Sequence, residues 1–191
     1  MPRPPVVAHV LRRLRRLPDR LLHTSRRRAA RAALAARQPV RSVLVVCNGN
    51  IFRSPFAAAI LKRTLDHSGV AVDSAGFVGP GRPSPADAVA AAARRGIDLR
   101  RHRSQLLTPD LVRGADVILV MDAAQRRAIC ERFGRAPQDV LFLGDFDPLP
   151  IDRRAIEDPW EQSPAVCEAV YRRIEDCVGT LARGLGSTAN R

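Results

Sequence analysis

The sequence predicts a single three-layer α/β domain in which a four-stranded parallel sheet, doubly wound in the Rossmann- or flavodoxin-like manner, carries helices on both faces. Four short apolar runs bounded by turn-forming residues have the pattern of buried parallel strands. Segments with helical periodicity alternate with these runs, and that alternation calls for right-handed crossovers. The length of 191 residues is enough for one well-buried domain with some chain left over.

The first strand is expected at residues 43–46, where it leads through a glycine-containing loop into a helix that opens at Ser54 and Pro55. Apolar residues at helical spacing continue to Leu65. A strand that feeds a helix in this way forms an anion cradle, because backbone N–H groups and the positive helix end converge on one point. The sequence therefore predicts a phosphate-shaped pocket here.

The later elements continue the alternation of strands and helices. Ser84 is expected to be the N-cap of the second helix, and Gly96 is expected to close it. Ligands of such sheets bind at the carboxyl ends of the strands, which places the site beyond the first strand. The expected elements are a strand at 70–74, a Gly/Pro-rich loop at 75–83, a helix at 84–95, a strand at 116–121, a helix at 123–133, a strand at 140–143 and a helix at 164–185.

Positive charge is concentrated at the start of the chain. The formal net charge is +13, and residues 1–41 hold twelve arginines and one acidic residue, Asp19. We divide the chain into a basic leader at 1–41, flexible or amphipathic helical, a domain at 42–186 and a tail at 187–191. The domain is nearly neutral, and no nucleic-acid partner is expected.

The leader has its own pattern. Apolar residues fall on one helical face between Val6 and Leu17, with arginines around the rest, and Pro18 is expected to interrupt this helix. A basic amphipathic helix can lie on an anionic membrane surface. A disordered solubilising arm, a targeting peptide, or translated sequence upstream of the true start compete with that interpretation.

Cysteine usage indicates a reducing compartment, and we expect the protein to be cytoplasmic. The spacing of the cysteines matches neither a metal site nor a small disulfide framework, so no metal and no cofactor are expected. No apolar run approaches the length of a membrane-spanning helix. The four cysteines are Cys47, Cys130, Cys167 and Cys177.

The first position of the cradle is a cysteine, which distinguishes it from a nucleotide-binding loop. Cys47 ends the strand, Arg53 follows six residues later, and Ser54 can donate a hydrogen bond to the sulfur. Converging amides and a guanidinium favour a thiolate, which can attack phosphorus while the arginine grips two oxygens. Cys47 could instead be a small buried apolar residue, but the order of strand, loop and helix favours a nucleophile.

Thiolate attack on a phosphate ester also needs an acid to protonate the leaving oxygen. Two Asp-Pro pairs lie in the loop after the last strand, at Asp147-Pro148 and at Asp158-Pro159. Both could be ordinary turn residues. Local residues alone do not separate Asp147 from Asp158 as the acid.

Residues from about Val43 to Leu185 resemble the low-molecular-weight protein tyrosine phosphatase family. The resemblance rests on the loop Cys-Asn-Gly-Asn-Ile-Phe-Arg-Ser-Pro at 47–55 and on Asp158-Pro159-Trp160. Further landmarks are Ser74-Ala75-Gly76, Gly96-Ile97-Asp98-Leu99, His102 and Val120-Met121-Asp122.

The resemblance implies a role for each matching residue. Cys47 is the nucleophile, Arg53 the phosphate clamp, and Asp158 the acid of the first step and the base of the second. The phosphate-binding loop comprises Asn48, Gly49, Asn50, Ile51, Phe52, Arg53 and Ser54; the residues that support it are Asn50, Ser54, Ser74 and His102; the walls of the substrate pocket are Asn48 and Trp160.

Two departures from the family pattern are visible. Phe52 stands where many members carry a second cysteine that forms a reversible disulfide with the nucleophile. Trp160-Glu161 stands where a pair of aromatic residues is common, so a single aromatic wall and a more open pocket are expected.

Phosphotyrosine on proteins is the expected substrate, because a deep cradle with an aromatic rim selects a phosphate on a long flat arm. In bacteria, members of the family often oppose autophosphorylated tyrosine kinases of exopolysaccharide export. Arginine phosphatases tend to carry threonine where this chain has Ile51, and arsenate reductases need a closely spaced cysteine pair that is missing here. A phosphate-binding regulatory module with a membrane-docking leader is the alternative outside enzymes.

Overall fold

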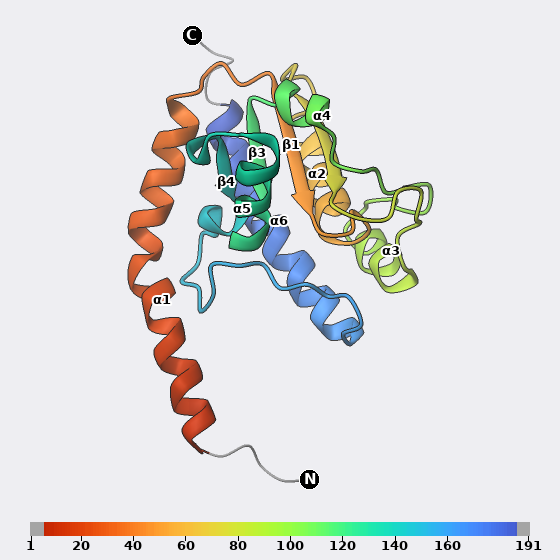
Figure 1. The fold of residues 1–191 in the computed structure, drawn as a ribbon. Helices are drawn as coiled ribbons and strands as arrows, with labels where there is room; N and C mark the ends of the chain where they lie inside the picture. Colours follow the sequence, from red (N-terminus) through yellow and green to blue (C-terminus); the bar gives the residue numbers. More distant parts are fainter. Residues whose placement is uncertain (1–5, 187–191) are drawn as a thin grey trace.

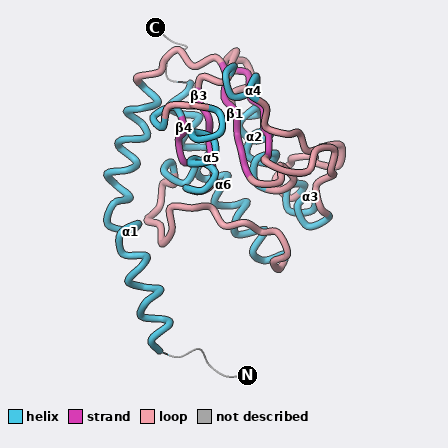
Figure 2. Tube along the Cα trace, viewed as in Figure 1, coloured by secondary structure: helices cyan, strands magenta, loops and turns pink. Residues whose placement is uncertain are grey.

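The computed structural model describes residues 6–186, and side chains from residue 19 onward. The predicted tail at 187–191 lies outside the described residues. Four parallel strands form one sheet of order β2-β1-β3-β4, grouped at the centre of the molecule with helices around them (Figures 1 and 2). This confirms the predicted fold class. The strands are β1 Ser42–Cys47, β2 Ala71–Gly76, β3 Val117–Val120 and β4 Val140–Phe142.

The sheet is covered on both faces, as its strand sequences require. Along β1, Val43 and Val45 enter an apolar cluster with α1, α2, α3 and α6, whereas Leu44 and Val46 enter a second cluster with α4 and α5. Within residues 6–186, no helix combines the length and apolar character needed to cross a membrane. The helices are α1 Val6–Ala35, α2 Arg53–Thr64, α3 Ala86–Ala93, α4 Pro109–Gly114, α5 Ala123–Phe133 and α6 Pro164–Gly186, with short 3-10 turns η1 Pro137–Asp139 and η2 Leu143–Phe146.

The leader contains one long helix rather than two segments. Helix α1 runs from Val6 to Ala35, so the predicted interruption at Pro18 is wrong. Proline removes one backbone hydrogen bond from a helix, but packing can offset that cost. Ala30 and Leu34 bury their side chains in the core, which stabilises the later half of α1 on the domain.

Two local predictions around α3 and α4 also need correction. Helix α3 begins at Ala86 after an extended Pro85, and Ser84 is buried with a hydroxyl that has no partner among the described residues, so Ser84 is not the N-cap. Helix α4 was not predicted, because six residues are too few to show a helical period. The predicted closure of α3 at Gly96 is confirmed, since Gly96 has a φ of 71° and Ile97 N donates to Ala92 O.

Candidate active site

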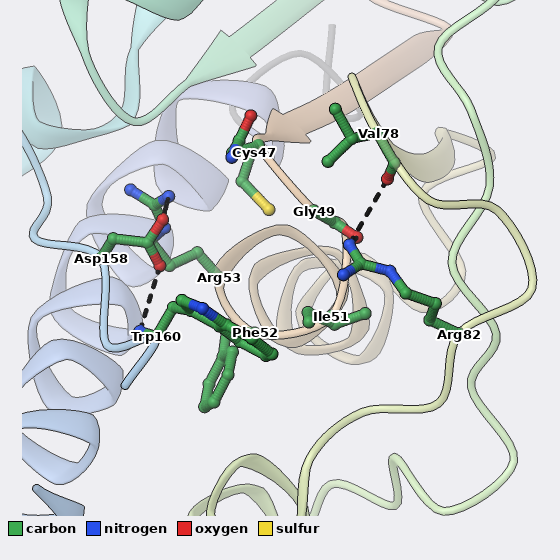
Figure 3. Close-up of a pocket in the computed structure, with 10 residues that line it drawn as sticks. Cys47, Gly49, Ile51, Phe52, Arg53, Val78, Arg82, Asp158 and Trp160 are labelled. Atoms are coloured by element: carbon green, nitrogen blue, oxygen red, sulfur yellow. Dashed lines mark hydrogen bonds and ion pairs between the residues drawn. The ribbon is translucent and has the colours of Figure 1, made fainter. Parts of the chain in front are cut away.

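The predicted anion cradle is the loop that joins the end of β1 to the start of α2. The Cys47 Sγ atom points into a pocket of about 190 Å³ at the carboxyl edge of the sheet (Figure 3). Across the described residues, none of the backbone N–H groups of residues 48–52 donates to a protein acceptor. Together with the N-terminus of α2, these N–H groups form a donor set suited to an anion.

The orientation of the N–H groups of residues 49, 50, 51 and 53 follows from the carbonyls that precede them. A trans peptide places its C=O and the following N–H on opposite sides, so a carbonyl bonded outside the loop turns the next N–H toward the cradle. Four loop carbonyls have such outside donors. These are Asn48 O with Phe77 N at 2.7 Å, Gly49 O with Arg82 Nη2 at 3.2 Å, Asn50 O with His102 Nε2 at 2.7 Å and Phe52 O with Tyr171 Oη at 3.1 Å.

Asn50 braces the loop from within. Its Nδ2 donates to Ser54 Oγ and to Ser74 Oγ, both at 2.9 Å, while its Oδ1 accepts from Gln105 N at 2.9 Å. The left-handed φ of 50° at Asn50 suits asparagine better than most side chains. With its oxygen occupied by Asn50, the Ser54 hydroxyl can direct its proton to Cys47 Sγ, 3.0 Å away. The support residues named from the sequence thus form one network.

Arg53 is 3% exposed and lines the same pocket as Cys47. Its Nη1 donates to Ile156 O at 3.1 Å, and its Nη2 forms an ion pair with Asp158. Its buried Nε has no partner among the described residues. Because Nε and Nη2 share one edge of the guanidinium, they can bind two phosphate oxygens once Asp158 releases Nη2.

The structure separates the two Asp-Pro pairs. Asp158 lines the pocket at its rim, and its carboxylate lies near Arg53 (Figure 3). Asp147 is buried elsewhere, where its carboxylate accepts from Arg173 Nε at 2.9 Å and from Leu149 N at 3.1 Å. Only Asp158 is therefore placed to exchange a proton with a bound substrate.

The aromatic side of the pocket combines an exposed ring with a buried one. Trp160 is 48% exposed, and its ring meets the ring of Phe52 edge to face, with centroids 6.3 Å apart. The sequence predicted one aromatic wall, Trp160, and considered Phe52 as the replacement of a cysteine; the ring of Phe52 is 6% exposed and packs in the core. The lining residues are Cys47, Asn48, Gly49, Ile51, Phe52, Arg53, Val78, Arg82, Asp158 and Trp160.

Arg82 is a site residue that sequence reasoning missed. Its guanidinium lies across the pocket from Asp158 (Figure 3) and donates to Gly49 O and Gly79 O. A Cβ at Gly49 would lie 2.7 Å from Arg82 Nη2, so glycine is needed for this approach. The hydrogen bonds of Arg82 within the described residues go to carbonyl oxygens and not to a carboxylate, so its positive charge is not neutralised at the pocket. The Gly/Pro-rich loop after β2 was the available signal, but the sequence predicted only turns there.

Replacing Arg82 by alanine is expected to weaken inhibition by inorganic phosphate about tenfold, since one charge-assisted hydrogen-bond donor contributes about 1.4 kcal/mol. The turnover number for p-nitrophenyl phosphate should change less, because Arg53 and Asp158 stay in place. Inhibition constants at fixed ionic strength measure the effect. Arg127→Ala, an exposed arginine on α5, is the matched control. Equal inhibition constants for Arg82→Ala and the control would contradict this role.

Tyr171, which supports the loop from α6, keeps its proton. Burial raises the pKa of Tyr171 well above its ordinary value, so this residue remains a phenol that donates to the loop. No group of three or more His, Cys, Asp or Glu side chains in the described part of the chain could hold a metal ion.

Comparisons with known proteins agree with this geometry. The model of the family "Low molecular weight phosphotyrosine protein phosphatase" matches residues 42–190. The chain is 38% identical over 153 residues to the probable low molecular weight protein-tyrosine-phosphatase EpsP of Ralstonia solanacearum, covering 80% of this chain and 96% of the relative.

Solved phosphatase structures also align with this chain. The structure of Vibrio vulnificus Wzb in complex with benzylphosphonate aligns with a TM-score of 0.68 at 29% identity, covering 75% of this chain and 98% of the other. The YwlE arginine phosphatase from Geobacillus stearothermophilus aligns with a TM-score of 0.70 at 32% identity, covering 78% of this chain and 94% of the other.

Proposed function

Because the chain belongs to the low molecular weight phosphotyrosine protein phosphatase family, we propose that Cys47, Arg53 and Asp158 hydrolyse phosphotyrosine on proteins through a phosphocysteine intermediate. The chain is a cysteine-dependent protein-tyrosine phosphatase by this membership. One observation supports these residue roles: the Cys47 sulfur, loop residues with unbonded N–H groups, Arg53 and Asp158 all line one pocket.

In the first step the phosphate occupies the cradle and displaces Asp158 from Arg53 Nη2. The Cys47 thiolate attacks phosphorus opposite the leaving oxygen, and the S–P bond forms as the P–O bond to the phenol breaks. The protonated carboxyl of Asp158 donates its proton to the departing oxygen. The N–H groups of the loop and the Arg53 fork bind the phosphoryl oxygens, where negative charge is distributed in the transition state.

In the second step a water molecule attacks the phosphocysteine. Asp158, now a carboxylate, accepts a proton from this water, and the S–P bond breaks to release inorganic phosphate. The Ser54 hydroxyl, 3.0 Å from Sγ, can donate to the leaving thiolate. The enzyme returns to its starting state without consuming a cofactor.

Pocket shape supports an aryl phosphate as substrate. Cys47 is 2% exposed at the base of the pocket, so the phosphate must reach the sulfur on a long arm. The exposed ring of Trp160, which meets the buried ring of Phe52 edge to face, can pack against a phenyl ring. A serine phosphate carries its phosphorus on a shorter arm and has no ring for this contact.

Arginine phosphatases are a specific second candidate, since one of the similar solved structures has that activity in its name. The side chain of Ile51 is 6% exposed and lines the pocket, where its apolar branch suits a tyrosine ring better than a guanidinium. Values of kcat/KM on matched phosphotyrosine and phosphoarginine peptides test the choice. Preference for phosphotyrosine supports the proposal, and preference for phosphoarginine overturns it.

The partner remains a proposal drawn from family resemblance: an autophosphorylated tyrosine kinase of exopolysaccharide export in the cytoplasm of a bacterium. Contact of the leader with an anionic membrane also stays a prediction, because the amphipathic pattern lies at residues 6–17, whose side chains are outside the described ones.

Peroxide is expected to inactivate the enzyme irreversibly at Cys47, because Phe52 replaces the cysteine that could trap a sulfenic acid as a disulfide. Burial raises the pKa of Cys167 to about 11 and also raises the pKa of Cys177. Both therefore remain thiols at neutral pH, where the thiol reacts with peroxide far more slowly than a thiolate. Activity after thiol treatment and mass spectrometry of the cysteine peptides measure the result. Full recovery with thiol would contradict it.

A further inference from the structure

Helix α1 lies outside the matched family region, which begins at residue 42, yet it packs along the segment that leads to the catalytic pocket (Figure 1). We define residues 147–158 as the acid segment, because Asp158 stands at its end. We propose that α1 positions the acid segment and thereby sets the efficiency of proton transfer by Asp158. This inference rests on the proposed role of Asp158 as the acid.

Three side chains of α1 bond to the backbone of the acid segment. Asp19 Oδ2 accepts from Arg154 N at 2.9 Å, His23 Nε2 donates to Asp147 O at 3.2 Å, and Arg27 Nη1 donates to Pro148 O at 3.1 Å. Because all three partners are main-chain atoms, these bonds restrain the path of the chain rather than the side chains that it carries. His23 is 4% exposed, so its bond is shielded from water.

Asp19 is suited to a permanent restraint at neutral pH. Burial alone would raise its pKa, but the hydrogen bonds from Arg154 N and Arg26 outweigh burial and lower the pKa below the ordinary 3.8. The stabilisation from Asp19 is therefore complete above pH 3.8 and is lost only as the pH falls through the lowered value.

The anchor at Arg154 connects directly to the catalytic residues. Two residues later, Ile156 N donates to Met121 O at 2.9 Å, and Ile156 O accepts from Arg53 Nη1 at 3.1 Å. On the other side, Arg173 of α6 donates to Ala155 O at 2.8 Å. The acid segment is thus held between α1 and α6, and a small displacement of Asp158 would cost proton-transfer efficiency.

The later half of α1 is itself fixed to the domain. Leu34 is 2% exposed, and its Cδ2 approaches Gly184 of α6 so closely that a Cβ there would lie at 2.9 Å. Arg37 Nη2 binds Asp139 Oδ1 at 2.6 Å. A helix anchored in this way can restrain the loop that it contacts.

The test uses the full-length double variant Asp19→Ala with Arg27→Ala, which keeps the net charge unchanged. The matched control is Arg31→Ala with Asp110→Ala, which also keeps the net charge and changes only exposed residues. Values of kcat/KM are measured on a series of aryl phosphates from p-nitrophenyl phosphate, whose leaving group needs little protonation, to phenyl phosphate, whose leaving group needs more. The loss of kcat/KM in the double variant should be about fivefold larger on phenyl phosphate than on p-nitrophenyl phosphate. This difference is a fraction of the 10²–10⁴-fold contribution of a general acid.

Two further variants serve as references for the leaving-group dependence. Asp158→Asn should steepen the leaving-group dependence most; if it does not, the acid assignment itself fails. Asp19→Asn keeps an acceptor for Arg154 N and should behave as the native chain. Thermal melting shows whether all variants are folded at the assay temperature. A steeper dependence in the double variant, but not in the Arg31→Ala/Asp110→Ala control or in Asp19→Asn, supports the proposal. Equal losses on all substrates, or no loss, overturn it while Asp158→Asn still responds.

Discussion

Replacing Cys47 by serine is expected to reduce turnover of p-nitrophenyl phosphate by more than about a thousandfold, equivalent to about 4 kcal/mol of transition-state stabilisation. A serine hydroxyl at this position keeps the hydrogen bond to Ser54 but is scarcely ionised at neutral pH, so no strong nucleophile remains. Steady-state assays without added metal measure the loss.

A matched control and a direct trap accompany this variant. Cys130→Ser replaces a partly exposed cysteine outside the pocket lining and should leave turnover unchanged. Rapid acid quench of the native enzyme followed by mass spectrometry should find the phosphoryl group on the peptide that contains Cys47. Phosphate attached elsewhere, or turnover by Cys47→Ser at a native rate, would exclude Cys47 as the nucleophile.

Arg53→Lys is expected to lower kcat by about 10²–10³-fold, the range found when a single oxyanion donor is removed. Lysine keeps the positive charge but lacks the planar fork that Nε and Nη2 present to two phosphate oxygens. Its single nitrogen would also replace two separate guanidinium nitrogens, Nη1 and Nη2, which bind Ile156 O and Asp158. Values of kcat and KM on p-nitrophenyl phosphate separate lost transition-state binding from lost ground-state binding.

Arg63→Lys, an exposed position on the same helix, controls for the chemical change without touching the pocket. Thermal melting of both variants checks the fold, because Arg53 is buried and its removal changes two contacts of the acid segment. An Arg53→Lys enzyme within about threefold of the native kcat would contradict the clamp role, since a lost charged hydrogen bond contributes more than that.

Local sequence was enough to predict those features whose pattern repeats over neighbouring residues. The strands came from apolar runs, the helices from their period, and the cradle from a strand, a glycine loop and a helix start at Ser54 and Pro55. These features depend on residues that are close along the chain, so their order predicted both the fold class and the nucleophile.

Local sequence failed where the deciding partner is distant. The two Asp-Pro pairs look alike, and their difference arises because Arg173 binds Asp147 while Arg53 binds Asp158. Arg82 was missed because its acceptor, Gly49 O, lies 33 positions earlier in the chain. The continuation of α1 through Pro18 likewise coincides with burial of Leu34 against the domain.

By itself, the sequence determined the α/β architecture and predicted Cys47 as a nucleophile and Arg53 as a phosphate clamp at the carboxyl edge of a parallel sheet. Apolar period and loop spacing are properties of neighbouring residues, so they can be read locally. The family resemblance favoured Asp158 over Asp147 as the acid, and the tertiary structure shows that Asp158 lines the pocket with Cys47. Only the tertiary structure decided which side chains orient the loop and that α1 contacts the acid segment. Those outcomes depend on hydrogen bonds such as Tyr171 to Phe52, 119 positions apart, which no local pattern specifies.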